Sequence, residues 1–159
     1  MIRLGKLTDY GVVLMTFMAR DGSAVLRTSR DLAVESKLPL PTVSKVLKKL
    51  LENGLLTSHR GIKGGYSLAK KADQISVADI VVAIEGPIAL TECSDLDRSC
   101  EVEHSCPIKN NQRIVSDVVR GALEKVTISD LLHPLQLVAI RNTRGQLVPS
   151  FEIISGSMQ

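Results

Sequence analysis

The chain lacks tryptophan altogether, and only two tyrosines and two phenylalanines occur among its 159 residues. Because 44% of the residues are nevertheless hydrophobic, the core must be aliphatic, which favours packed helices. Long apolar runs are absent too, since the longest, Val12–Ala19, contains Thr16 and is too short to span a bilayer. The N-terminus carries no apolar region followed by a cleavage site, so we expect a cytoplasmic protein with no signal peptide and no membrane partner.

Cysteine is also scarce, and its three copies all fall in Thr91–Asn110, TECSDLDRSCEVEHSCPIKN. Three thiols cannot all pair as disulfides, and clustered cysteines in a reducing cytosol more often bind metal or do redox work. The spacing of Cys93, Cys100 and Cys106 is C-x6-C-x5-C, which differs from structural zinc knuckles and from ferredoxins. Thiolates select zinc, copper(I) or iron–sulfur clusters, so spacing alone leaves zinc, a cluster and a ligand-free thiol switch open.

Positive charge is modest in total but concentrated in one segment. The net charge is +3, yet residues 41–71 carry seven lysines and arginines against Glu52 alone. Residues 91–103 carry five acidic residues against Arg98. A local basic patch indicates a nucleic-acid partner more strongly than the total charge does.

The basic segment begins with a short predicted helix, Ser29–Lys37, with Ser29 as its N-cap. The prolines of Leu38–Pro41 end this helix, because proline lacks the N–H that a helix interior needs. The residues expected to face inward are Leu32, Ala33 and Val34.

A second helix is predicted over Thr42–Asn53, with Pro41 in its first turn. Its apolar residues recur at i, i+3, i+4, i+7 and i+8, which predicts one buried stripe. They are Val43, Val46, Leu47, Leu50 and Leu51. By itself this pattern also fits an ordinary amphipathic surface helix with a solvated lysine face.

The residues that follow favour DNA binding. Leu55–His59 and Gly65–Ala69 are predicted strands joined by the Gly-rich turn Arg60–Gly64. Two helices followed by a hairpin with a cationic tip predict a winged helix-turn-helix, with the second helix in a major groove. We expect Arg60 to enter a narrow minor groove. The predicted DNA-binding residues are Ser29, Pro41, Thr42, Ser44, Lys45, Lys48, Lys49, Arg60 and Lys63.

Further helices flank this unit. Thr8–Arg20 is predicted to start at a Thr8 cap with Asp9 in its first turn, where the helix dipole favours a carboxylate. Ser76 and Asp79 predict a capping box for the segment that ends at Gly86. Pro107 opens a long helix to about Glu124 whose apolar stripe predicts a homodimer, because two-fold symmetry suits two DNA half-sites.

The predicted protein is therefore mainly α, a winged helix-turn-helix with a two-stranded wing, a cysteine loop and a long dimerisation helix. The expected divisions are a DNA-binding domain, a cysteine loop, a dimerisation helix and a tail of unassigned role. They cover residues 1–86, 87–107, 108–133 and 134–159. In the tail, Gln136–Ile140 and Leu147–Ile154 could form strands about a turn at Asn142–Gly145, and the last residues look frayed.

The chain resembles IscR/NsrR-type regulators of the Rrf2 superfamily. The resemblance rests on LTDYGVVLM, LPLPTVSKVLKKLLENGLL, RGIKGGYSLA, ISVADIVVAIEG and three cysteines before a Pro-started helix. It covers about Met1–Leu132, and EGPIALTEC resembles the branch that regulates SUF iron–sulfur assembly.

This resemblance implies a homodimeric transcription factor, a repressor for example, that senses iron–sulfur status, nitric oxide or redox state through a 2Fe–2S or 4Fe–4S cluster. Cys93, Cys100 and Cys106 carry over as its ligands. The histidine that IscR places three residues after the last cysteine is replaced by Lys109. The NsrR-type motif LTDYG instead implies Asp9 of the partner subunit as fourth ligand, with His104 as the local alternative.

Other classes of function remain as alternatives. A zinc-bound winged-helix repressor would use the same thiols, and a cluster carrier or scaffold would need neither the basic helix nor the wing. No histidine or carboxylate constellation stands near a nucleophile, so we expect no enzyme, no catalytic residues and no small-molecule substrate.

Overall fold

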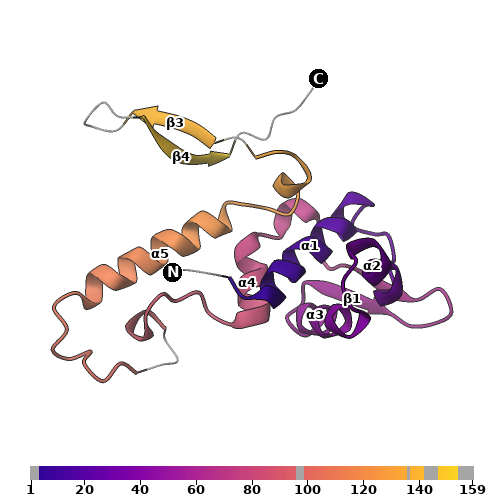
Figure 1. Cartoon of the computed structure of the whole chain (residues 1–159), viewed down its shortest axis with the longest axis horizontal. Helices are drawn as coiled ribbons and strands as arrows, with labels where there is room; N and C mark the ends of the chain where they lie inside the picture. Colours follow the sequence, from indigo (N-terminus) through magenta and orange to yellow (C-terminus); the bar gives the residue numbers. More distant parts are fainter. Residues whose placement is uncertain (1–3, 96–98, 136, 142–146, 154–159) are drawn as a thin grey trace.

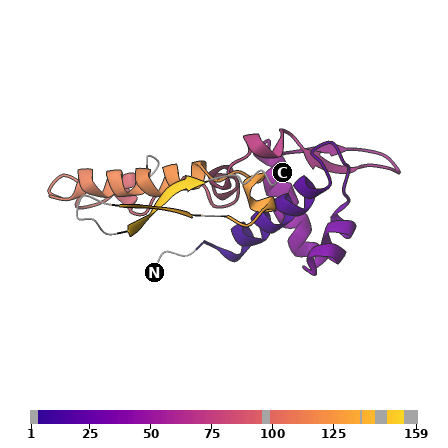
Figure 2. The same cartoon turned by 90° about the horizontal axis from the view of Figure 1, so that it is seen from above.

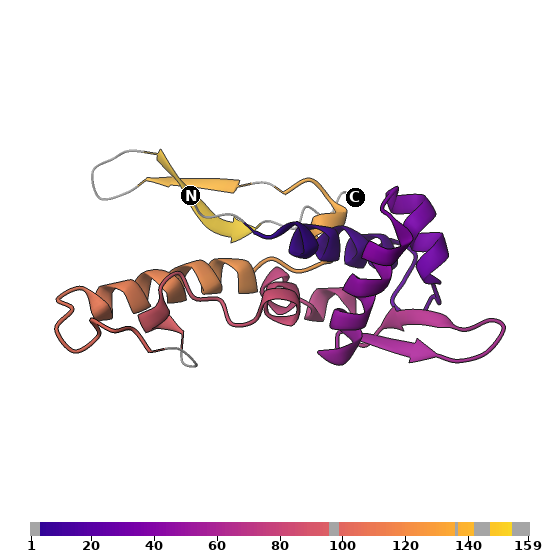
Figure 3. The ribbon, with the colours of Figure 1, turned by 60° about the horizontal axis from the view of Figure 1, so that its bottom comes forward.

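The computed structural model of the chain describes residues 4–95, 99–135, 137–141 and 147–153. Helices dominate, and the molecule is elongated, with the wing at one end and the long helix at the other (Figures 1, 2 and 3). No helix among these residues is long and apolar enough to cross a membrane. The main elements are α1 (Lys6–Arg20), α2 (Ser29–Ser36), α3 (Leu40–Glu52), β1 (Leu56–His59), β2 (Gly65–Leu68), α4 (Val77–Glu85), α5 (Lys109–Glu124), β3 (Leu137–Arg141) and β4 (Leu147–Ile153). Short 3-10 turns are η1 (Ala72–Gln74), η2 (Glu92–Ser94) and η3 (Asp130–Leu132).

The core lies where α1 packs against α3 and α4. Leu14 and Met18 of α1 are buried there. A Cβ atom at Gly11 would collide with the Ile84 side chain of α4, so the two helices pack too closely for any larger residue. This contact accounts for a glycine inside a helix, where glycine costs about 1 kcal/mol relative to alanine.

The predicted Thr8 cap of α1 is wrong. The N-cap is Gly5, and Thr8 is buried in the first turn, where its hydroxyl donates to the Glu85 carboxylate of α4. Glu85 Oε1 also accepts the Gly5 N–H at 2.7 Å, so a carboxylate from another helix replaces the missing capping side chain. Asp9 lies in the first turn, as predicted, and is exposed.

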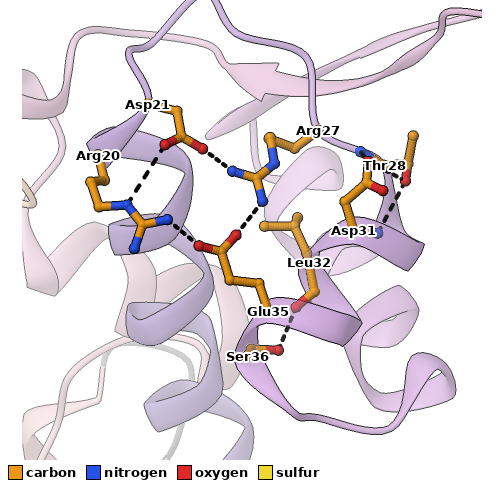
Figure 4. Close-up of polar contacts among 8 residues, drawn as sticks. All are labelled: Arg20, Asp21, Arg27, Thr28, Asp31, Leu32, Glu35 and Ser36. Carbon is orange, nitrogen blue, oxygen red and sulfur yellow. Dashed lines mark hydrogen bonds and ion pairs between the residues drawn. The ribbon is translucent and has the colours of Figure 1, made fainter.

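The N-cap of helix α2 lies one residue earlier than predicted. Thr28, not Ser29, is the N-cap, because its hydroxyl accepts the Asp31 N–H at 3.2 Å while Asp31 accepts the Thr28 N–H (Figure 4). The Thr28 hydroxyl also donates to Asp31 Oδ2 at 2.7 Å, and this bond first, then the bond from the Thr28 N–H, lowers the pKa of the Asp31 carboxyl. Leu32 is buried as predicted. Val34 is 81% exposed, because residues two positions apart in a helix point to nearly opposite faces.

The second predicted helix and the wing are confirmed. Helix α3 starts at Leu40 with Pro41 in its first turn. Strands β1 and β2 pair antiparallel from Leu56↔Leu68 to His59↔Gly65. The base of the hairpin is anchored by the buried leucines of the first of these pairs, and its tip extends away from the core (Figure 3).

The segments after the wing return to the core. The Ser76–Asp79 capping box of α4 is present, as predicted. Helix α5 starts at Lys109, two residues after the expected proline. Beyond α5, the Val77 N–H donates to the Val126 carbonyl at 2.8 Å, and Ile128 is fully buried in the core.

The tail forms the two strands that its sequence pattern indicated. Strands β3 and β4 pair antiparallel, with a register shift between Leu137 and Val138. The predicted turn at Asn142–Gly145 and the last residues, Ser155–Gln159, lie outside the described residues.

Candidate nucleic-acid interface and cysteine loop

Helix α3 presents a polar face to solvent. Its apolar stripe is buried, through Val43, Val46, Leu47 and Leu50. On the other face Pro41, Ser44, Lys45 and Lys48 are exposed, and Thr42 is half-buried. Lys48 Nζ lies 3.8 Å from Glu52 Oε1, and both side chains are more than half exposed, so this ion pair is weak. The exposed face therefore offers hydroxyls and ammonium groups to a DNA groove.

Two predicted DNA residues occupy other positions. Ser29 is the first residue of α2 and is half-buried. Lys49 is turned toward α4, where its ammonium donates to the Ile84 carbonyl at 2.5 Å. Asn53 also donates to that region, to the Ala83 carbonyl at 3.1 Å. Lys49 thus satisfies the end of α4 within the chain, in contrast to Lys45.

The tip of the wing is cationic and fully exposed. Arg60 and Lys63 form no ion pair within the described part of the chain. Gly61 has φ of 118°, a conformation that glycine adopts without strain. Between the two cations, Ile62 is fully exposed, an apolar side chain that sequence reasoning did not single out.

The cysteine loop begins in η2 and ends at α5. Cys93 is buried, with its sulfur 3.2 Å from Thr91 Oγ1, while Cys100 and Cys106 are half-buried. All three are free thiols. Just before the loop, the chain is attached to the middle of α5. The Leu90 N–H donates to the hydroxyl of the buried Ser116 at 3.1 Å.

Arg113 of α5 holds both ends of this loop. Its Nε donates to the Cys93 carbonyl at 2.8 Å, and its guanidinium lies 3.2 Å from the Glu103 carboxylate. Lys109 Nζ is 2.6 Å from the same carboxylate. These cations, Lys109 above all, lower the pKa of the Glu103 carboxyl. The two Arg113 contacts join residues ten and twenty positions apart, so the sequence pattern gave no signal for them.

The chemistry of these donors fits a soft metal centre, since free thiols become the thiolate ligands of zinc or iron. Their arrangement is incomplete in one chain. Within the ranges that the structure describes, no three His, Cys, Asp or Glu side chains converge on one point. A complete ligand set therefore requires movement of the loop, a second chain, or both.

The two candidates for a fourth ligand are both exposed. Asp9 points from the first turn of α1, and His104 lies in the loop beside Glu103. Lys109, at the position where the sequence resemblance implied a ligand histidine, is engaged in the ion pair with Glu103.

Helix α5 leaves three large apolar side chains exposed. Ile114, Val115 and Val118 are all exposed, and Ser116 is the buried residue of this fully described helix. The helix packs on η2 and α4 along its other side. An exposed apolar row of this kind marks an interaction surface.

Comparison with known proteins points to one family. A profile described as Rrf2, an iron-dependent transcriptional regulator, matches residues 4–134. The chain is 27% identical to protein rrf2 of Nitratidesulfovibrio vulgaris over 136 residues, covering 86% of this chain and 91% of that one. It is 26% identical to the HTH-type transcriptional regulator IscR of Escherichia coli O1:K1 / APEC over 139 residues, covering 87% and 85%.

Solved structures agree with the predicted fold. CymR, the global cysteine regulator of B. subtilis, superposes with a TM-score of 0.66 at 25% identity, covering 83% of this chain and 97% of that one. T. potens IscR gives a TM-score of 0.61 at 25% identity, with coverage of 82% and 86%. The prediction of a mainly helical winged-helix regulator is thereby confirmed.

Proposed function

Because the chain belongs to the Rrf2 family of DNA-binding transcriptional regulators, we propose that it acts as a homodimeric repressor that senses iron–sulfur status, redox state or nitric oxide through a bound iron–sulfur cluster. The observation that carries this proposal is the loop of three free thiols held against α5, the helix that would join two copies. The segment Glu85–Cys93 resembles the SUF branch, so we assign iron–sulfur assembly genes as its targets.

DNA reading would use α3 and the wing together. Lys45 and Lys48 are exposed on the face opposite the core and can reach phosphates of a major groove. Arg60 stands at the wing tip, where a cation can enter a narrow minor groove. Two such units in a two-fold dimer would read two half-sites.

The dimer would form through α5. Its exposed side chains Ile114 and Val118 lie four residues apart, on one face of the helix. In a two-fold dimer the same helix of a second copy would cover this row, so no other segment is needed, which is the usual arrangement in a symmetric regulator. This pairing would also bring the cysteine loop of one chain toward the other subunit.

Cys93, Cys100 and Cys106 would hold the cluster, with Asp9 of the partner subunit as fourth ligand. When bound, the cluster supplies a centre that reacts with oxidants and nitric oxide. Arg113 keeps the Cys93 end of the loop close to Glu103, which shortens the rearrangement needed to gather the thiols. A carboxylate is a harder ligand than a thiolate, so a site completed by Asp9 would release its cluster more readily.

Cluster binding would regulate DNA binding through the dimer. If Asp9 comes from the first turn of α1, the cluster joins one DNA-reading unit to the loop of the other chain. A coupling free energy of about 1–3 kcal/mol would change DNA occupancy roughly 5- to 150-fold.

Native mass spectrometry of anaerobically purified protein tests the proposal directly. We expect a dimer with one cluster for each chain, and an operator affinity that changes when the cluster is removed. One zinc ion for each chain, with no sulfur-to-iron absorption, would select the zinc repressor instead. Transfer of the cluster to an acceptor without specific DNA binding would select the carrier, and operator binding that ignores the cluster would exclude sensing.

The fourth ligand is tested by comparing Asp9→Ala with His104→Ala after anaerobic reconstitution. We expect Asp9→Ala to change the circular dichroism of the cluster and shorten its lifetime, while His104→Ala behaves as the wild type. A normal, equally durable cluster in Asp9→Ala would show that Asp9 is not the ligand.

A further inference from the structure

Four charged side chains form a closed ring between α1 and α2. Arg20 and Arg27 each approach both Asp21 and Glu35 (Figure 4). The longest of these approaches, Arg20 Nε to Asp21 Oδ1, is 3.6 Å. Each residue therefore has two partners of opposite charge and the ring closes on itself, unlike the single ion pair of α3 and the open three-residue groups of α5.

Arg27 is the most enclosed member of the ring. Its side chain is 15% exposed and that of Glu35 is 24% exposed, against 54% for Arg20. Charges at this depth are screened less by solvent than exposed ones. Both guanidinium groups, Arg27 first, lower the pKa of the Glu35 carboxyl.

The backbone of Arg27 connects the same ring to the wing. Its N–H donates to the Tyr66 carbonyl at 2.9 Å, and its carbonyl accepts the Tyr66 N–H at 2.8 Å. Tyr66 lies in the middle of β2 and pairs with Ser58 across the hairpin. Arg27 thus acts as a third, one-residue strand beside the wing.

These contacts have a geometric consequence for DNA reading. Strand β1 follows α3 after residues 53–55, and the buried Leu56 and Leu68 hold the base of the hairpin. The Arg27 bridge adds a contact on the other edge of β2, at Tyr66, nearer the tip. Arg27 holds that edge and attaches it to α1 through Asp21 and to α2 through Glu35. Since α2 packs against α3, this series of contacts connects the wing to α3.

We propose that Arg27 is a positioning residue for DNA recognition, which fixes the wing relative to the helix-turn-helix so that α3 and Arg60 engage adjacent grooves together. Arg27 itself touches no DNA in this arrangement. The ring fixes the direction of the wing before binding, so that less ordering is required when Arg60 meets a minor groove. This role concerns DNA reading alone and does not depend on the cluster.

A double-mutant cycle separates this role from a general effect on folding. The variants are Glu35→Gln, which keeps the side-chain shape but removes its charge, Arg60→Ala, and the two combined. The probe is a DNA duplex selected from a random pool by the wild-type protein, and affinity is measured by fluorescence anisotropy. Asp117→Asn is the matched control, because it removes a 2.7 Å ion pair with Arg120 far from the wing.

We expect Glu35→Gln to weaken binding about threefold or more in the wild-type background and to have little effect once Arg60 is gone, because two sites coupled through a backbone shift have non-additive effects. Arg27→Met, which keeps the backbone bridge, should likewise weaken DNA binding only while Arg60 is present. Asp117→Asn should leave affinity unchanged. Far-ultraviolet circular dichroism at the assay temperature checks that each variant is folded.

Three results would overturn the proposal. One is an equal loss from Glu35→Gln in both backgrounds, which would indicate a general effect. Another is no loss in either background. The third is an Arg60→Ala variant with unchanged affinity, because the wing would then make no contact for Arg27 to position.

Discussion

Residues 4–86 and the segment from the cysteine loop to the end of α5 differ in how far they satisfy their own contacts. The first region buries Leu14, Leu47 and Ile80 completely and caps two of its helices with paired side chains. Along α5, by contrast, Ile114 and Val118 face solvent. The apolar side chains that form the core of the first region are covered within the chain, in part by Ile128 from beyond α5, whereas the apolar row of α5 is exposed.

The two regions also differ in electrostatics. The exposed cations of α3 and the wing, such as Lys45 and Arg60, are left for a partner. In the cysteine loop, the Glu103 carboxylate is already paired with Lys109 and Arg113. The cations on the proposed DNA-binding surface are therefore exposed, whereas the charged side chains that hold the cysteine loop pair with one another. Variants can test each half of this comparison.

The largest expected effect is on the packing of the first region. Leu47→Ala removes a fully buried side chain of α3 and should lower the free energy of unfolding by about 2–5 kcal/mol, measured by chemical denaturation. Val34→Ala is the matched control, since Val34 is exposed on α2 and its truncation should cost no more than about 0.5 kcal/mol. Equal losses in both variants would contradict the difference in packing.

The next effect concerns the uncovered face of α5. Val118→Glu places a charge on a side chain that is 62% exposed in one chain but would be covered in a dimer. We expect the dimer to dissociate about 30-fold more readily, seen by sedimentation, with helix content retained. Arg120→Glu introduces the same side chain on the other side of the helix and should leave the dimer intact. A Val118→Glu variant that associates normally would show that α5 is not the interface.

A smaller effect distinguishes two neighbouring lysines of α3. Lys45→Ala should weaken DNA binding and reduce the slope of log affinity against log salt by about 0.9, as expected for one lost phosphate contact. Lys49→Ala should leave that slope unchanged, because its ammonium is bonded to the Ile84 carbonyl. A reduced slope in Lys49→Ala would mean that Lys49 turns toward DNA on binding.

Local signals account for what the sequence predicted well. Hydrophobic periodicity located the buried stripe of α3, and the Gly-rich turn located the wing. Caps were less reliable. Ser29 has the same chemistry as Thr28, and only the reciprocal bond with Asp31 distinguishes the true N-cap. The predicted Thr8 cap was wrong because the Thr8 hydroxyl donates to the carboxylate of Glu85, which is distant in sequence.

Contacts between residues remote in sequence account for what the pattern could not reveal. Arg113 reaches Cys93 across twenty positions, and Arg27 joins β2 through its backbone, which carries no sequence signal at all. The ligand set has the same difficulty. Three thiols mark the loop, but within the described residues they do not converge on one point, and their spacing does not encode how they would be gathered.

The smallest expected effect is a difference in acid response between the regions. The pKa of Glu35 lies below its ordinary value of 4.5 in the folded chain, mainly because of Arg27, so the unfolded chain takes up its proton first as pH falls. The contribution of Glu35 to stability is thus complete above about pH 5 and is lost as pH drops through the folded pKa. Glu35→Gln should therefore make unfolding less acid-dependent, by about one proton at most.

The pKa of Glu103 is also lowered, but Glu103 stabilises a loop outside the core. Glu103→Gln should leave the unfolding profile unchanged. It should instead remove the acid-induced loss of protection from hydrogen exchange at the Ser105 amide, which bonds within the loop. If Glu103→Gln alters global unfolding as much as Glu35→Gln does, the two regions fold as one unit and the comparison fails.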